Sequence, residues 1–355
     1  MLSRVDELTL AMNRFTRLLN DRPWLLADGA TGSNLFQVGL VSGEAPETWN
    51  FEHPDRIQQL HKSFVAAGAD IILTNSFGGT RYRLKLHQLD GKVHAVNRRA
   101  AELARLEADA SGRDVAVAGS MGPTGEILEP LGPLSLADAQ AAFAEQAHAL
   151  AEGGVDVLWI ETMSSKEEVE AAIAGAKTTG LPIVTTMSFD TNGRTMMSLT
   201  PADLVAIQQQ QGIQACGSNC GVGPSEMVAS ILNMTNAANS DTVIVAKGNC
   251  GIPHYADGAI VYDGTPELMA TYATMALDAG ARIIGGCCGT SAAHLKAMRT
   301  ALEQHVRGDR PTASTIEAKL GPLTMGAKAQ LEGLMDRASG AAQGAQVRRS
   351  TRRRG

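Results

Sequence analysis

The sequence predicts an α/β protein, a (β/α)8 barrel of the TIM type with a C-terminal extension. Eight short apolar runs alternate with eight segments of helical periodicity, which is the pattern of repeated strand–helix units. Small-residue turns, such as Ala-Gly-Ala-Asp at 67–70 and Ala-Gly-Ala-Arg at 279–282, end a helix just before the next strand. A doubly wound open sheet is the competing layout, but no Gly-x-Gly-x-x-Gly follows the first strand.

The expected elements follow one another in chain order. Residues 1–20 form an amphipathic pattern and are expected to be helical. The expected strands are Trp24–Asp28, Asp70–Thr74, Val115–Gly119, Asp156–Glu161, Ile183–Ser188, Gln214–Asn219, Val243–Lys247 and Arg282–Gly286. The expected helices are Pro54–Ala67, Lys92–Ala110, Leu136–Glu152, Lys166–Thr179, Pro201–Gln211, Ser225–Met234, Pro266–Ala279 and Ala292–Gln304. Several of these helices open with an N-terminal signal such as Ser135 or Thr200-Pro201.

Composition bounds the organisation of the chain and its partners. Of the 355 residues 44% are hydrophobic and only 4% aromatic, so the core must consist mainly of Ala, Val, Leu, Ile and Met. We assign residues 1–305 to the barrel and 306–337 to a C-terminal arm or helix. Residues 338–355 are expected to form a disordered basic tail, because their Gly, Ala, Gln and Arg cannot form a core. The net charge of −6 and the lack of a long apolar run argue against nucleic acid and membrane as partners.

All five cysteines lie in the second half of the chain. Their odd number, with no signal peptide, predicts reduced thiols in a cytoplasmic protein. Cys287 and Cys288 lie between glycines at the end of one apolar run, and Cys220 ends another. In a barrel the C-terminal ends of all strands meet at the face that carries active sites. We therefore expect these three thiols to converge on one soft metal ion, with the open position of a catalytic zinc site.

Other interpretations of the cysteines stay open. Cys216 lies inside the sixth strand and is expected to pack in the core, and Cys250 is left outside the ligand set. Without a metal, Cys287 and Cys288 could instead form a vicinal disulfide in a thiol redox or binding protein. A purely structural metal is a further possibility. Metal analysis of freshly purified, reduced protein separates the enzyme from the redox protein, because only the enzyme would carry about one zinc per chain.

Three motifs together resemble the zinc-dependent homocysteine S-methyltransferases over roughly residues 20–305. They are Asp28-Gly29-Ala30-Thr31-Gly32, Asn219-Cys220-Gly221 and Gly285-Gly286-Cys287-Cys288-Gly289. The resemblance implies a barrel enzyme and homo-oligomer in which Cys220, Cys287 and Cys288 hold zinc, with the homocysteine sulfur in the fourth position. It also implies that Asp28, beside Gly29, and Glu161 hold the substrate amino group. Asp28 could alternatively cap the turn at Gly29. Asn75 and Ser76 are expected to bind polar parts of either substrate.

The methyl donor is less closely defined by the resemblance. Thr162 and Gly78 stand where animal betaine enzymes carry aromatic residues, whereas the whole-chain pattern resembles stand-alone bacterial betaine–homocysteine methyltransferases. We expect no cobalamin or folate module after the barrel, which favours a small donor, glycine betaine. S-methylmethionine, dimethylsulfoniopropionate and a methylated corrinoid protein are the alternatives. A quaternary ammonium or sulfonium group binds aromatic faces, and the candidates are Trp49, Phe77 and Tyr82, although Trp49 and Tyr82 could be surface or interface aromatics.

Overall fold

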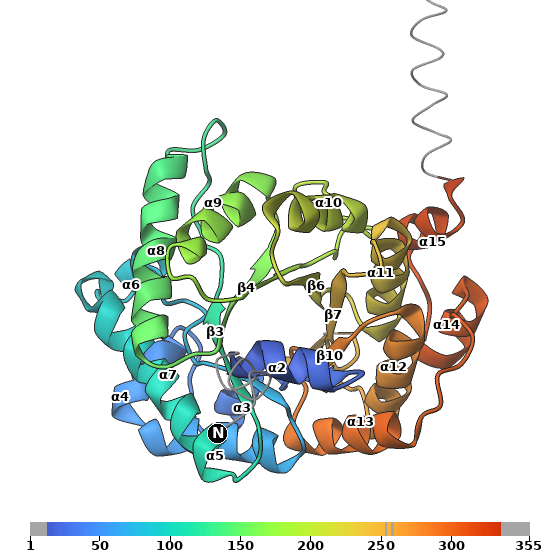
Figure 1. The fold of residues 1–355 in the computed structure, drawn as a ribbon, viewed down its shortest axis with the longest axis horizontal. Helices are drawn as coiled ribbons and strands as arrows, with labels where there is room; N and C mark the ends of the chain where they lie inside the picture. Colours follow the sequence, from blue (N-terminus) through green and yellow to red (C-terminus); the bar gives the residue numbers. More distant parts are fainter. Residues whose placement is uncertain (1–12, 253, 257–258, 335–355) are drawn as a thin grey trace, which may run out of the picture.

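The protein is a closed barrel of eight parallel strands surrounded by helices (Figure 1). The structure is a computed structural model that describes residues 13–252, 254–256 and 259–334. Neighbouring strands follow the order β1-β10-β7-β6-β5-β4-β3-β2, and a parallel bridge between Ala27 and Ile71 closes the ring. The strands are β1 (Leu25–Leu26), β2 (Ile71–Leu73), β3 (Ala116–Met121), β4 (Val157–Met163), β5 (Ile183–Met187), β6 (Ala215–Cys220), β7 (Val243–Gly248) and β10 (Ile283–Gly286). The predicted (β/α)8 barrel is confirmed.

Eight long helices alternate with these strands, as the sequence predicts. They are α5 (Pro54–Ala66), α7 (Val93–Ala110), α8 (Leu136–Glu152), α9 (Lys166–Lys177), α10 (Pro201–Gln211), α11 (Pro224–Ala237), α12 (Pro266–Ala279) and α13 (Ala292–Gln304). The N-terminal signals act as expected, because the side chains of Ser135 and Thr200 each accept a backbone hydrogen bond from the first turn of the following helix, as does that of Thr265 before α12.

Shorter elements follow three of the strands and were not predicted. The helices α3 (Gly32–Gln37), η1 (Pro46–Thr48) and α4 (Trp49–Glu52) follow β1, and α6 (Arg81–Lys85) and η2 (Asp90–Lys92) follow β2. A two-stranded hairpin of β8 (His254–Ala256) and β9 (Ala259–Val261) follows β7. Because they follow the C-terminal ends of strands, these insertions lie at the face of the barrel where active sites form.

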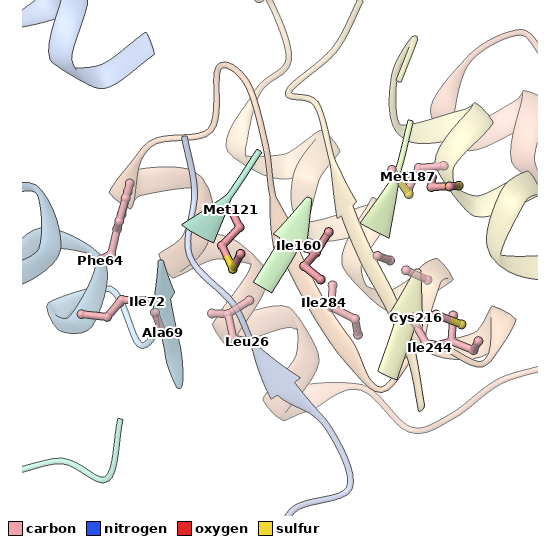
Figure 2. Packing of buried hydrophobic residues seen from close by; sticks show 14 of the residues in the cluster. Leu26, Phe64, Ala69, Ile72, Met121, Ile160, Met187, Cys216, Ile244 and Ile284 are labelled. Carbon is pink, nitrogen blue, oxygen red and sulfur yellow. The ribbon is translucent and has the colours of Figure 1, made fainter. Parts of the chain in front are cut away.

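Alternating side chains divide the core into two parts. Successive strand residues point to opposite sides of the sheet, so one set packs outward against the helices, where Phe64 of α5 is also buried (Figure 2). The outward set includes Leu26, Ile72, Ile160, Met187, Cys216, Ile244 and Ile284. The inward set fills the barrel itself, with Trp159 as its largest member, and includes Leu25, Ala27, Ile71, Leu73, Val157, Val184, Val245 and Ile283. The barrel is therefore a filled core below its C-terminal face.

Helix α2 (Arg14–Asp21) closes the N-terminal end of the barrel. It crosses the strands in Figure 1, and Phe15, Leu18 and Leu19 are buried in the same cluster as the first inward residues of the strands. The Asn13 amide donates to the carbonyl of Asp156 at 2.6 Å, just before β4. The expected N-terminal helix is thus present in its second half, and residues 1–12 lie outside the described part of the chain.

The C-terminal segment packs on the outside of the barrel. It contains α14 (Ala313–Leu320) and α15 (Met325–Leu331), both of which contact α11. The Glu226 carboxylate accepts a hydrogen bond from the Thr324 backbone at 2.6 Å, and Lys328 pairs with Glu317 at 2.9 Å. The expected tail at 338–355 lies outside the described residues. Among the helices that are described, none is long and apolar enough to cross a membrane.

A buried carboxylate fastens the N-terminal end of the barrel. Asp70, directly before β2, is fully buried and is contacted by Arg22, Arg113 and Arg299, the last at 3.0 Å. Its second oxygen also accepts a hydrogen bond from the Leu26 backbone at 2.9 Å, across the seam between β1 and β2. Several donors therefore offset the cost of burying one charge at the place where the ring closes.

We expect Asp70→Ala to lower the free energy of unfolding by about 2–4 kcal/mol, because it leaves the Leu26 amide unpaired and the three guanidinium groups without their shared carboxylate. Urea denaturation measures this loss. Asp114→Ala is the matched control, since Asp114 is 36% exposed in its pair with Arg17 and such pairs contribute about 1 kcal/mol or less. Equal losses in the two variants would contradict the role given to Asp70.

Candidate active site

Three cysteine side chains meet at the C-terminal face of the barrel. Cys220 ends β6, and Cys287 and Cys288 follow β10. The Cys220 sulfur lies 2.9 Å from that of Cys287 and 3.9 Å from that of Cys288, and all three sulfurs lie within 4.8 Å of one another. The structure therefore brings together the three thiols that the sequence analysis expected to converge. No other group of three or more possible metal-binding side chains occurs among the described residues.

Backbone geometry aims these sulfurs at one point. Cys220 has a φ of 58°, a left-handed conformation that is rare for a residue with a side chain and that turns the chain away from the direction of β6. The Cys287 backbone donates to the carbonyl of Gly248 at 2.7 Å, and the Cys288 backbone donates to the Asn249 side chain at 3.1 Å. The end of β7 thus holds the cysteine pair from one side.

The other two cysteines lie outside the cluster. Cys216 is buried among the outward residues of the sheet, and burial raises the pKa of its thiol to about 12. The Cys250 thiol donates to the carbonyl of Gly264 at 3.0 Å, and burial raises its pKa to about 11. Both thiols remain protonated at neutral pH, so neither has the reactivity of a thiolate.

A cavity of about 460 Å³ opens above the three sulfurs. The loop after β1 forms one wall, the loop after β2 forms another, and Tyr262 after the hairpin lies beside the cysteines. Its lining includes Gly29, Phe36, Glu47, Asn75, Ser76, Phe77, Arg83, Ser120, Glu161, Thr162, Lys247 and Tyr262 in addition to the three cysteines. This volume is in the range of small-molecule sites.

Two of the cavity-lining side chains are ionisable groups on inward positions of strands. Glu161 of β4 accepts a hydrogen bond from the Ser120 hydroxyl, and burial raises its pKa to about 7. Lys247 of β7 forms an ion pair of 2.6 Å with Asp28, and both side chains are at most 2% exposed. The deepest part of the cavity therefore carries one carboxylate and one ammonium group.

The Asp28 carboxylate is engaged by other residues of the barrel. Its carboxylate is absent from the cavity wall, because one oxygen binds Lys247 and the other accepts the Leu73 backbone hydrogen bond at 2.7 Å. The expected contact between Asp28 and a substrate amino group stays a prediction, and the charged side chain that Asp28 contacts in this structure is Lys247. Gly29 does line the wall, and a Cβ there would lie 2.5 Å from the Thr290 carbonyl oxygen.

Asn75 and Ser76 line the cavity but are already engaged. The Asn75 amide donates to the carbonyl of Pro46 at 2.7 Å and to Asn50 at 3.1 Å. The Ser76 hydroxyl donates to the carbonyl of Ser120 at 2.8 Å. These bonds tie the loop after β2 to its neighbours, so the two residues shape the wall.

Of the three aromatic residues proposed for the donor, the structure places only Phe77 at the cavity, where its ring is 37% exposed. Trp49 lies in the core, where it is 2% exposed, edge-on to His53 and below Arg56. Tyr82 packs against the cluster of Leu128, Leu134, Ala139 and Ala171, so a donor contact of Trp49 or Tyr82 stays a prediction. Neither ring is among the residues that line the cavity.

Comparison with known proteins identifies the family of the chain. Residues 25–302 match the family model described as homocysteine S-methyltransferase. The chain belongs to this family.

Known relatives of the chain differ in size. The methionine synthases of Mycobacterium tuberculosis and Mycobacterium leprae are each 26% identical to it, over 302 and 303 residues, which is 81% of this chain and 25% of theirs. The chain thus spans about a quarter of the length of these curated relatives. Structures of the homocysteine methyltransferase MmuM from Escherichia coli, in oxidized and metallated forms, are 24% identical, with TM-scores of 0.69 and coverage of 81% of this chain and 99% of theirs. At that identity the likeness shows the fold.

The sequence analysis missed two prominent groups of the methyltransferase site. Lys247 continues the inward alternation of Val243 and Val245, so its position inside the barrel could have been read from the pattern. Tyr262 follows the unpredicted hairpin. Burial is the main cause that raises the pKa of its phenol, and the nearby Cys288 is the second. No periodicity marked Tyr262, because it lies in a loop.

We expect Gly286→Ala to lower the free energy of unfolding by about 1–3 kcal/mol. A Cβ at Gly286 would lie 2.3 Å from the Thr290 side chain, so the turn that carries the cysteine pair must shift. Gly91→Ala is the control, because nothing lies within 4 Å of a Cβ at Gly91. Urea midpoints of both variants test the claim, which fails if Gly286→Ala is as stable as Gly91→Ala.

Proposed function

We propose that this methyltransferase is zinc-dependent and moves a methyl group from glycine betaine to the sulfur of homocysteine, forming methionine. The observation that carries the proposal is the cluster of Cys220, Cys287 and Cys288 at the bottom of a cavity large enough for two small zwitterions. Its cytoplasmic location and its assembly as a homo-oligomer stay predictions from the sequence.

The three thiols fit a zinc ion by chemistry and by spacing. Zinc favours cysteine sulfur, and a tetrahedral ion with bonds near 2.3 Å separates its sulfur ligands by roughly 3.8 Å. The Cys220–Cys288 separation of 3.9 Å already matches this value, and the Cys220–Cys287 pair at 2.9 Å needs to open by less than about 1 Å. Three protein ligands leave one position for a substrate, as catalytic zinc sites require.

The chemistry that the ion would supply is a lowered pKa of the homocysteine thiol, whose unperturbed value is about 8.5. The protein side chains then position the reactants. Glu161, held by Ser120, binds the α-ammonium group of homocysteine. The sulfur attacks the methyl carbon, a sulfur–carbon bond forms, and the carbon–nitrogen bond breaks with its electron pair left on the departing amine. Holding the two reactants in this alignment supplies much of the rate enhancement.

The outer cavity suits a donor that carries both a cationic methyl-bearing group and a carboxylate. Phe77, Phe36 and Tyr262 offer aromatic faces to a quaternary ammonium, and Glu47 adds a buried carboxylate. Arg83 on the same wall offers a partner for the donor's carboxylate. Glycine betaine has these two groups, separated by a single methylene.

The donor is tested by incubating zinc-loaded protein with homocysteine and one donor at a time, and measuring methionine in a single turnover. We expect methionine from glycine betaine and none after the metal is removed by a chelator. Methionine only from S-methylmethionine, dimethylsulfoniopropionate or a methylated corrinoid protein would reject glycine betaine and keep the family reaction. No methionine from any donor would reject the proposal as a whole.

We expect Cys288→Ser to lose most of its zinc and to lower kcat/KM by about 100-fold or more. Mutation of a residue that only hydrogen-bonds to a metal ligand already lowers metal affinity or activity by about 10- to 100-fold. Cys250→Ser is the matched control, because its side chain lies outside the cluster and a hydroxyl can keep the bond to Gly264. Metal content and activity are measured on reduced protein. Two results together would favour the thiol redox protein instead. The reduced wild-type protein would hold no metal, and the same protein after oxidation would contain a Cys287–Cys288 disulfide.

A further inference from the structure

Lys247 is a buried lysine for which the proposed reaction has so far no role. It stands at an inward position near the end of β7, where its ammonium group lies 2.6 Å from Asp28 and 5.7 Å from the centre of the Trp159 ring. Although only 2% exposed, it lines the cavity together with Glu161 and the cysteines. A charged lysine at this depth is costly unless its hydrogen-bond donors are used.

The pair with Asp28 uses only part of the lysine's capacity. An ammonium group has three donors, and Asp28 is its one hydrogen-bond acceptor among the described residues. Both Asp28 oxygens already accept a hydrogen bond, one from Lys247 and the other from the Leu73 backbone, and Asp28 is absent from the cavity lining. A second ammonium group, from a substrate, would meet a carboxylate that is already neutralised and a like charge beside it.

Glu161 has the opposite character. Its one donor among the described residues is the Ser120 hydroxyl, so the carboxylate keeps acceptor capacity on the cavity side. The cavity therefore presents a carboxylate and an ammonium group that can each form further hydrogen bonds, both next to the cysteine cluster. A free amino acid is a zwitterion whose two charged groups sit on one carbon atom. Opposite charges at the deep end of the cavity match this pair of groups.

We propose that Lys247 binds the α-carboxylate of homocysteine, while Glu161 binds its α-ammonium group. This rests on the proposed function, because it places the substrate sulfur at the three cysteines. The strand register supports the reach: Lys247 pairs with Gly285 across β7 and β10, and Cys287 lies two residues further along. Asp28 then acts as a positioning residue that holds Lys247 and does not touch the substrate.

A competing role for Lys247 is to neutralise Asp28 and so keep the carboxylates in place for the substrate amine. The two roles predict different losses when Lys247 is replaced. If Lys247 binds the carboxylate, recognition of the carboxylate end of homocysteine is lost; if it only neutralises Asp28, recognition of the amino end is lost. 3-Aminopropane-1-thiol is homocysteine without its carboxylate, and 4-mercaptobutanoate is homocysteine without its amine. Binding of these two thiols therefore separates the two ends of the molecule.

The experiment is calorimetric titration of anaerobic, zinc-loaded protein with each of the three thiols and no methyl donor. We expect Lys247→Met to weaken homocysteine and 4-mercaptobutanoate by about 10- to 100-fold and 3-aminopropane-1-thiol by less than about threefold. Glu161→Gln should show the reverse, weakening the two amines and sparing 4-mercaptobutanoate. Lys296→Met, on the exposed side of α13, is the control and should bind all three as the wild type does.

Two further measurements keep the proposal open to failure. Lys247→Met leaves the Asp28 carboxylate buried and unpaired, which can destabilise the protein. The double variant Asp28→Asn/Lys247→Met removes this charge and is made in parallel. The variant that retains its zinc is taken as folded and is used for the titrations. A crystal structure of the wild-type complex with homocysteine needs no variant and should place the carboxylate within hydrogen-bond distance of the Lys247 ammonium.

Loss of 3-aminopropane-1-thiol binding as large as that of homocysteine in the lysine variant, or a carboxylate held elsewhere in the crystal, overturns the role of Lys247 and leaves the proposed function intact. Failure of the wild type to bind any of the three thiols would instead overturn the proposed function.

Discussion

Closure of the parallel sheet between β1 and β2 is the constraint on which the rest of the structure depends. A closed ring of parallel strands brings all eight C-terminal ends to one face, whatever their separation in the chain. Cys220 and Cys287 are 67 residues apart, yet their sulfurs are in contact because β6 and β10 flank β7 in the ring. An open sheet would leave the same residues on a line, without the shared cavity above them.

Charge in this barrel is concentrated at its two ends. At the N-terminal end Asp70 is surrounded by arginines that remain partly in solvent, so the charge is offset without burying the partners completely. At the C-terminal end Lys247 and Asp28 are both buried, and Glu161 lies near them with its pKa raised to about 7 by burial. Between the ends the interior is apolar. The buried charges of the barrel therefore lie at the closure between β1 and β2 and at the cavity.

Regular features of the chain allowed most of the barrel to be predicted. Alternating apolar runs and capping residues such as Thr200 fix strands and helices locally, and the ends of parallel strands then identify Cys220 and Cys287 as neighbours. Side-chain partners could not be predicted in this way. Trp49 is buried by residues from helices that precede and follow it, and Asp28 pairs with a lysine 219 residues away. Such contacts depend on the packing of the whole ring, which no local pattern encodes.

The helix that seals the far end of the barrel has a consequence for the order of events. With α2 packed into the N-terminal opening, reactants and products must pass through the same mouth. In the proposed reaction homocysteine would lie at the sulfurs and the donor nearer the rim, so the thiol would enter first and the spent amine would leave before methionine. A cavity with one opening would thus give the proposed reaction a last-in, first-out order.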